Sequence, residues 1–250
     1  NMSIGKFKFQ FIALFECALR PLPPHKCGAE GNVAANCPIN CNFPFYIQFH
    51  KKRLQFILYF GIIIKLERKL YGGTPMLDFI RVATAVPPVV VGDAVKNTED
   101  ICAYIAKADE AGCDVVLFPE LALTGYTCAD LFFQNTLLHE SMKGLEMITA
   151  CSKEHPAVTA VVGTPAVIEG QMYNCAAVIS GGVLRGLVTK THLPNYGEFS
   201  ERRWFSSSED LQTCQVTLRD LRMEGEGVVP VGRDLLFKVG EGTVLGVEIC

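Results

Sequence analysis

Three side chains that could do chemistry stand at the ends of apolar runs in this 250-residue sequence. Glu120, Lys190 and Cys250 each directly follow or close a stretch that is typical of a buried strand. Open α/β folds bind their ligands at the carboxyl ends of such strands. A carboxylate, an ammonium group and a thiol at one sheet edge would suit acid–base or nucleophilic catalysis.

Each of these residues also has an ordinary explanation. Glu120 could be a solvated loop carboxylate, Lys190 a surface lysine, and Cys250 a structural cysteine in a hydrophobic strand. Glu198 lies eight residues after the lysine and suits an anion that fixes a nearby cation. The order Glu, Lys, Cys, with separations of 70 and 60 residues, is more specific than any member alone.

Alternating strands and helices must position these residues. Asp93 is an expected N-cap of a helix over residues 94–111, with Gly112 at its end, and a second helix is expected over residues 130–154. Gly181-Gly182 predicts a two-residue hairpin turn. Residues 206–234 look irregular. The expected strands are Phe79–Val86, Asp114–Pro119, Ala157–Val162, Tyr173–Ser180, Val183–Thr189 and Val244–Cys250. This pattern predicts an α/β fold with a mixed sheet.

Three stretches of the sequence carry a family resemblance. They read FPELALTGYTCADLF around Glu120, KTHLPNYGEFSERRWF from Lys190, and GVEIC at Cys250. Together they resemble the nitrilase, or carbon–nitrogen hydrolase, superfamily. Within it they are closest to the glutaminase domain of glutamine-dependent NAD synthetase. The resemblance runs from Met76 to Cys250, and residues 1–75 resemble nothing in that family.

The resemblance implies the family's four-layer α/β/β/α sandwich over residues 76–250, truncated at its C-terminal side. It also implies the roles of three catalytic residues. Cys250 would attack the side-chain amide of glutamine, Glu120 would carry the proton, and Lys190 would stabilise the oxyanion.

The same resemblance implies a substrate site. Tyr126 and Tyr196 would line the pocket and the ammonia exit, and Glu198 would orient the lysine and the substrate. Ammonia would pass to a synthetase domain, absent from this sequence, that converts nicotinic acid adenine dinucleotide to NAD. ATP and Mg would belong to that domain, and no cofactor or metal ion is expected in this one. The expected partners are glutamine, the synthetase domain and further copies of the chain.

Two other functions stay open at this point. The chain could be a free-standing amidase or nitrilase of the same superfamily, or an inactive truncated scaffold. It is also expected to be a poor glutaminase as it stands. In the family, the backbone N–H after the cysteine helps to hold the oxyanion, and the sequence ends at Cys250.

Charge composition divides the sequence into two parts. Residues 1–75 hold ten Lys/Arg against three Asp/Glu, whereas residues 76–250 hold thirteen against twenty-three. This shift predicts that residues 1–75 are a basic, apolar extension, non-native or disordered, outside the hydrolase domain. Eleven scattered cysteines without a metal-ligand spacing indicate reduced thiols in a cytoplasmic protein. The net charge of −3 gives no sign of nucleic-acid or membrane binding.

Overall fold

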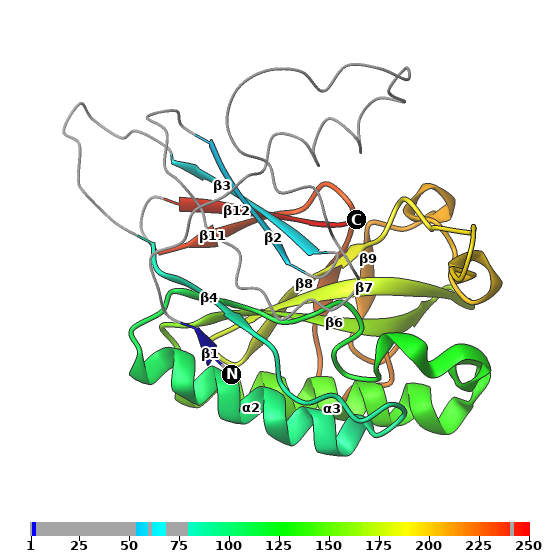
Figure 1. Cartoon of the computed structure of the whole chain (residues 1–250), viewed down its shortest axis with the longest axis horizontal. Helices are drawn as coiled ribbons and strands as arrows, with labels where there is room; N and C mark the ends of the chain where they lie inside the picture. The colour runs from blue at the N-terminus through cyan, green and yellow to red at the C-terminus, as the bar shows by residue number, and fades with distance from the viewer. Residues whose placement is uncertain (1, 4–53, 60–61, 69–79, 241–242) are drawn as a thin grey trace, which may run out of the picture. The chain divides into compact units, whose positions relative to one another are not determined.

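A mixed eight-stranded sheet forms the centre of the fold in the computed structural model, which describes residues 2–3, 54–59, 62–68, 80–240 and 243–250. The strand order is β1-β4-β5-β6-β7-β8-β10-β9 (Figure 1). In that order the strands are β1 (Met2–Ser3), β4 (Val82–Ala85), β5 (Val115–Leu117), β6 (Thr159–Ile168), β7 (Gln171–Ser180), β8 (Val183–Thr189), β10 (Val228–Gly232) and β9 (Gln215–Thr217). β4, β5 and β6 are parallel, whereas β6, β7 and β8 are antiparallel. The predicted α/β fold with a mixed sheet is therefore confirmed.

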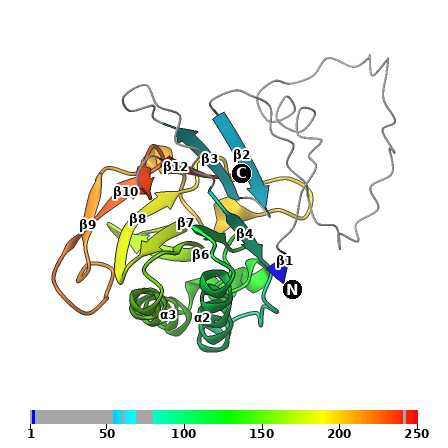
Figure 2. The same ribbon diagram turned by 90° about the vertical axis from the view of Figure 1, so that its left-hand side faces the viewer.

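Two long helices cover one face of this sheet. α2 (Ala94–Glu110) and α3 (Asn135–Glu154) pack against each other and run side by side (Figures 1 and 2). Their apolar faces meet β5 to β8, and the largest hydrophobic cluster lies at this contact. No helix in the described part of the chain is long and apolar enough to cross a membrane.

A second sheet carries the strand that leads to Cys250. It has the order β11-β12-β3-β2, and its strands are β11 (Leu236–Val239), β12 (Thr243–Ile249), β3 (Ile62–Arg68) and β2 (Leu54–Tyr59). β12 also packs against β7 and β8 of the larger sheet. The end of β12 is thereby held near the ends of the central strands.

Part of the N-terminal segment takes part in this second sheet. β3 pairs with β12 along the whole strand, from Thr243 opposite Arg68 to Ile249 opposite Ile62, and β2 pairs with β3. The other residues before Ile80, apart from β1, lie outside the described residues. The domain division at Met76 stays a prediction.

The capping signals of α2 act as expected. The Asp93 side chain accepts a hydrogen bond from the backbone N–H of Lys96 at 2.9 Å, which satisfies one free donor of the first turn. Gly112 follows the helix with φ +64°, in the left-handed region that favours glycine. The boundaries of this helix were thus predictable from local sequence.

The start of the second helix was predicted wrongly. Residues 126–133 form the 3₁₀ segment η1 (Tyr126–Phe133), and α3 begins only at Asn135. Ala129 has φ +50° and ψ −131°, and Gln134 is extended, so neither continues a helix. The break lets Cys128 and Phe132 join a buried cluster that also contains Phe205.

The hairpin between β7 and β8 confirms the Gly-Gly prediction. Gly181 and Gly182 have φ values of +57° and +77°, and Ser180 pairs with Val183. Residues 206–234, expected to be irregular, contain a short helix, η3 (Ser208–Asp210), as well as β9 and β10. β10 extends the central sheet by pairing in parallel with β8.

Candidate active site

Lys190 is the centre of a buried charge cluster. It directly follows β8, and its side chain is 1% exposed. The Nζ atom lies 2.7 Å from Oε1 of Glu120 and 2.9 Å from Oε1 of Glu201. A buried ammonium group needs such partners because removal from water disfavours its charge. The lysine is therefore not the surface lysine of the ordinary explanation, and its role as a catalytic residue stays a prediction.

Glu120 lies three residues beyond β5, on a loop that is bonded to β6. The backbone N–H of Phe118 donates to the carbonyl of Val161 at 2.9 Å, and that of Leu123 donates to the carbonyl of Gly163 at 3.1 Å. Besides the lysine, the Nδ2 atom of Asn174 donates to Oε1 of Glu120 at 2.6 Å. Burial raises the pKa of Glu120, although Lys190 and Asn174 oppose that shift. A raised pKa suits a carboxyl group that exchanges protons near neutral pH.

Glu201, which the sequence analysis did not single out, replaces Glu198 as the second carboxylate at the lysine. Glu198 is exposed, whereas Glu201 is 1% exposed and contacts Nζ. Glu201 begins the short helix η2 (Glu201–Arg203), and its backbone N–H donates to the carbonyl of Pro194. The expectation that Glu198 orients the lysine is therefore corrected: Glu201, three residues further along the chain, contacts Nζ, whereas Glu198 lies on the surface.

The residues that follow Glu201 bind side chains of η1. Arg203 donates two hydrogen bonds to Asp130, at 2.7 and 2.8 Å, and the Trp204 indole donates a third at 3.0 Å. Phe205 packs edge-on against Phe132, with ring centroids 5.0 Å apart. These contacts hold the backbone of Glu201 where its carboxylate meets the lysine.

The two tyrosines that were predicted to line the substrate pocket differ in their contact with Lys190 and its two carboxylates. The hydroxyl of Tyr126 donates to Oε1 of Glu201 at 2.6 Å. Burial is the main cause that raises the pKa of Tyr126 far above its usual value, and this hydrogen bond adds to the shift. Tyr196 is 71% exposed. Both rings pack edge-on against Phe199, with centroids 6.4 and 5.7 Å away. Their role in lining a substrate pocket stays a prediction.

Cys250 follows β12 and lies within the electrostatic reach of the cluster. Partial burial raises the pKa of its thiol, and Glu248 and Glu120 act in the same direction, whereas Lys190 lowers it. Of the three predicted catalytic residues, Glu120 and Lys190 are in direct contact, and the charges of both act on the Cys250 thiol. Their chemical roles stay predictions.

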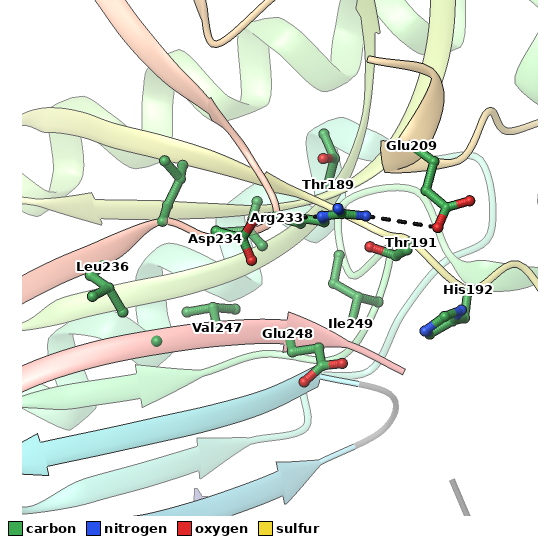
Figure 3. Close-up of a pocket in the computed structure, with 13 residues that line it drawn as sticks. Thr189, Thr191, His192, Glu209, Arg233, Asp234, Leu236, Val247, Glu248 and Ile249 are labelled. Carbon is green, nitrogen blue, oxygen red and sulfur yellow. Dashed lines mark ion pairs between the residues drawn. The ribbon is translucent and has the colours of Figure 1, made fainter. Parts of the chain in front are cut away.

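A cavity of about 460 Å³ lies beside the ends of β8 and β12 (Figure 3). Thr189 and Thr191, the neighbours of the lysine, line it together with Glu248 and Ile249 from β12. Arg233 spans it toward Glu209, with Nη1 3.8 Å from Oε1. Glu120, Lys190 and Cys250 are not among the residues that line it. Within the described ranges, no group of three or more His, Cys, Asp or Glu residues is arranged to hold a metal ion.

Gly163 makes close approach of the Glu120 loop to β6 possible. A Cβ atom at this position would lie 2.5 Å from the carbonyl oxygen of Pro119 and 2.8 Å from the carbonyl carbon of Glu120, and would collide with the amide of Leu121. We expect Gly163→Ala to displace this loop, to lower the free energy of unfolding by about 1–3 kcal/mol, and to reduce catalytic activity per folded molecule. Urea unfolding and activity measurements test both effects.

Gly170→Ala provides the matched control. Gly170 lies in the turn that joins β6, the strand of Gly163, to β7. It has φ +80°, and an added Cβ would have no atom within 4 Å. Backbone strain should reduce its stability by about 1–2 kcal/mol without an effect on activity. Full activity in folded Gly163→Ala would show that the loop tolerates the displacement.

Sequence and structure comparisons identify the family of this chain. Residues 81–250 match the carbon–nitrogen hydrolase family. A glutamine-dependent NAD(+) synthetase from Mycobacterium leprae is 34% identical over 176 residues, which cover 69% of this chain and 24% of that protein. The enzyme of that name from Xanthomonas campestris is 38% identical over 159 residues, with 63% and 28% covered.

A solved structure shows the same relationship. The crystal structure of a glutamine-dependent NAD(+) synthetase from Cytophaga hutchinsonii superposes with a TM-score of 0.54 and 28% identity, covering 64% of this chain and 26% of that one. The chain thus spans about a quarter of the length of the relatives it matches. The match over residues 81–250 confirms the resemblance to this enzyme superfamily, and the chain belongs to the carbon–nitrogen hydrolase family.

Proposed function

We propose that this protein hydrolyses the side-chain amide of glutamine through a thioester on Cys250. The observation that carries the proposal is the buried Lys190, held at 2.7 and 2.9 Å by two carboxylates, with the Cys250 thiol within reach of the same charges. Membership of the carbon–nitrogen hydrolase family supports the reaction class. The names of the relatives support glutamine as the substrate.

The hydrogen bonds of Lys190 leave it able to bind a substrate oxygen. An ammonium group has three N–H donors. Among the described residues, its partners are the two Oε1 atoms of Glu120 and Glu201. The remaining donor, on a compact and fixed charge, suits the oxygen of a tetrahedral intermediate. Glu201, itself held by the Tyr126 hydroxyl, would keep the lysine in place during the reaction.

Glu120 would move the proton in both halves of the reaction. As the Cys250 sulfur bonds to the amide carbon, the thiol proton passes to the carboxylate, and the carbonyl electrons move onto the oxygen near Lys190. When that oxygen re-forms its double bond, the carbon–nitrogen bond breaks and Glu120 returns the proton to departing ammonia. Water then attacks the thioester with Glu120 again as the base, releasing glutamate and the thiol.

Tyr126 and Tyr196 would form the wall of the substrate pocket on the side of Phe199. The ammonia would serve an ATP-dependent synthetase that converts nicotinic acid adenine dinucleotide to NAD, as the relatives' names suggest. ATP and Mg would be used by that synthetase domain. We also propose that the protein self-associates and that it is located in the cytoplasm.

The test is amide hydrolysis by the purified protein without ATP. L-glutamine should yield glutamate and ammonia in equal amounts, whereas L-asparagine and propionamide should be poor substrates. Mass spectrometry of the tryptic peptide that begins at residue 239 and contains Cys250 should detect the glutamyl thioester on Cys250. Hydrolysis of propionamide but not glutamine would instead favour another amidase of the family. Folded protein that releases no ammonia from any of the three, both in the form that ends at Cys250 and in a form extended beyond Cys250, would contradict the proposal.

A further inference from the structure

Asn174 occupies an unusual position in the middle of β7. Its side chain is fully buried, and its Nδ2 atom donates to Oε1 of Glu120, which lies 54 residues away in the sequence, at 2.6 Å. Its other polar atom, Oδ1, has no hydrogen-bond partner within the described part of the chain. A buried acceptor without a partner lowers stability, so packing alone does not explain an asparagine here.

The hydrogen bond from Asn174 has a geometric consequence for Glu120. Rotation about the terminal bond of a glutamate is only weakly restricted, so the direction of each carboxylate oxygen depends on its partners. Oε1 of Glu120 receives both Nζ of Lys190, at 2.7 Å, and Nδ2 of Asn174, at 2.6 Å. Among the described residues both of these hydrogen bonds fall on Oε1, which leaves Oε2 for the reaction.

We propose that Asn174 is a positioning residue that holds Oε1 of Glu120 and thereby directs Oε2 toward the Cys250 thiol. This inference rests on the hydrolysis proposed above, in which a proton leaves the sulfur for Glu120 while the electron pair stays on sulfur. A neutral amide suits this task because it orients the carboxylate without adding a second fixed cation. The bond from Asn174 also lowers the pKa of Glu120, although burial, the larger effect, raises it.

Asn174→Leu, which preserves the approximate volume and removes the donor, tests the proposal. We expect kcat for glutamine to fall about 10- to 100-fold, the effect of losing a hydrogen bond to a charged group, with little change in KM. The acidic limb of the pH profile should move to higher pH, because Glu120 then holds its proton more tightly. Asn174→Ala, which removes the donor without adding a charge, should move it in the same direction and covers the case in which the leucine variant does not fold.

Asn97→Leu is the matched control. Asn97 is also buried, at 1% exposure, and its Nδ2 donates to the carbonyls of Val90 and Leu123 at 2.8 and 3.0 Å. Its replacement should lower the melting temperature without moving the pH profile. If the asparagine variants lose activity while their pH profiles superimpose on that of the wild type, Asn174 is merely structural and the proposal is wrong.

A second measurement does not require the proposed reaction. In protein labelled with ¹³C at the glutamate carboxyl groups, the signal of Glu120 can be assigned by its loss in Glu120→Gln. This signal should titrate at higher pH in Asn174→Leu than in the wild type. Failure of the wild type to hydrolyse glutamine would reject the proposed function, whereas an unchanged Glu120 titration would reject the inference about Asn174.

Discussion

Replacement of Cys250 by alanine is expected to reduce glutamine hydrolysis by a factor of about 10⁴ or more, the size of effect found when a covalent nucleophile is removed. The thiol is the group that forms the thioester, so Glu120 and Lys190 would have no nucleophile to assist. KM should change little, because the proposed pocket residues are untouched. The measurement is initial-rate kinetics of glutamate release, with folding checked by thermal unfolding.

Cys214→Ala is the control for this prediction. Cys214 is also an exposed free cysteine, and it lies directly before β9, the last strand of the larger sheet. The control should retain wild-type rates, and its tryptic peptide should carry no glutamyl group. Equal activity of Cys250→Ala and the wild type would remove the thiol from the mechanism, even if the rest of the cluster were correct.

The positions of the catalytic candidates could be predicted because each depends on a local signal. β5, β8 and β12 are short and largely buried, so their sequences stand out as apolar runs, with the candidate residue directly after β8 and β12 and three residues after β5. The Gly181-Gly182 turn sets the pairing of Ser180 with Val183, although the register shifts between Ile179 and Val178 before β8 reaches its end. Such features need only a few neighbouring residues to be recognised.

Glu201 and Asn174 could not be found in this way because their roles depend on distant contacts. Glu198 and Glu201 belong to the same stretch, and the choice between them depends on Tyr126, which lies 75 residues before Glu201. Asn174 looks like an ordinary polar residue within a strand until the fold places Glu120 beside it. The kink at Ala129 likewise reflects tertiary packing of Phe132 and not a local helix-breaking residue.

Replacement of Lys190 by methionine is expected to affect both catalysis and stability. Loss of the proposed oxyanion donor should reduce kcat by about 10²–10³. It also leaves Glu120 and Glu201, which are 11% and 1% exposed, without their shared cation. Removing one partner of a buried ion pair lowers the free energy of unfolding by about 3–5 kcal/mol, because the remaining charge is uncompensated. Glutamine kinetics and urea unfolding at pH 8 test the two effects.

The stability defect should depend on pH in a defined direction. Lys190 lowers the pKa of Glu120, so its loss lets burial raise that pKa further above the unfolded value of 4.5. A carboxyl group whose pKa is higher in the folded state binds more protons there, so stability falls as pH rises from 4.5 toward the folded value. The difference between Lys190→Met and the wild type should therefore be smaller at pH 5 than at pH 8.

Lys96→Met is the control that shows whether the stability defect arises from burial of the lysine or from the loss of any ion pair. Lys96 lies 2.8 Å from Asp100 on α2, as close as Lys190 is to its carboxylates, but its side chain is 47% exposed. An exposed pair of this kind contributes about 0.3–0.5 kcal/mol, so this variant should be nearly as stable as the wild type and fully active. If Lys190→Met had equally small effects on stability and activity at pH 8, the two carboxylates would not need the lysine charge. The buried cluster would then be neither a source of stability nor the oxyanion site proposed for it.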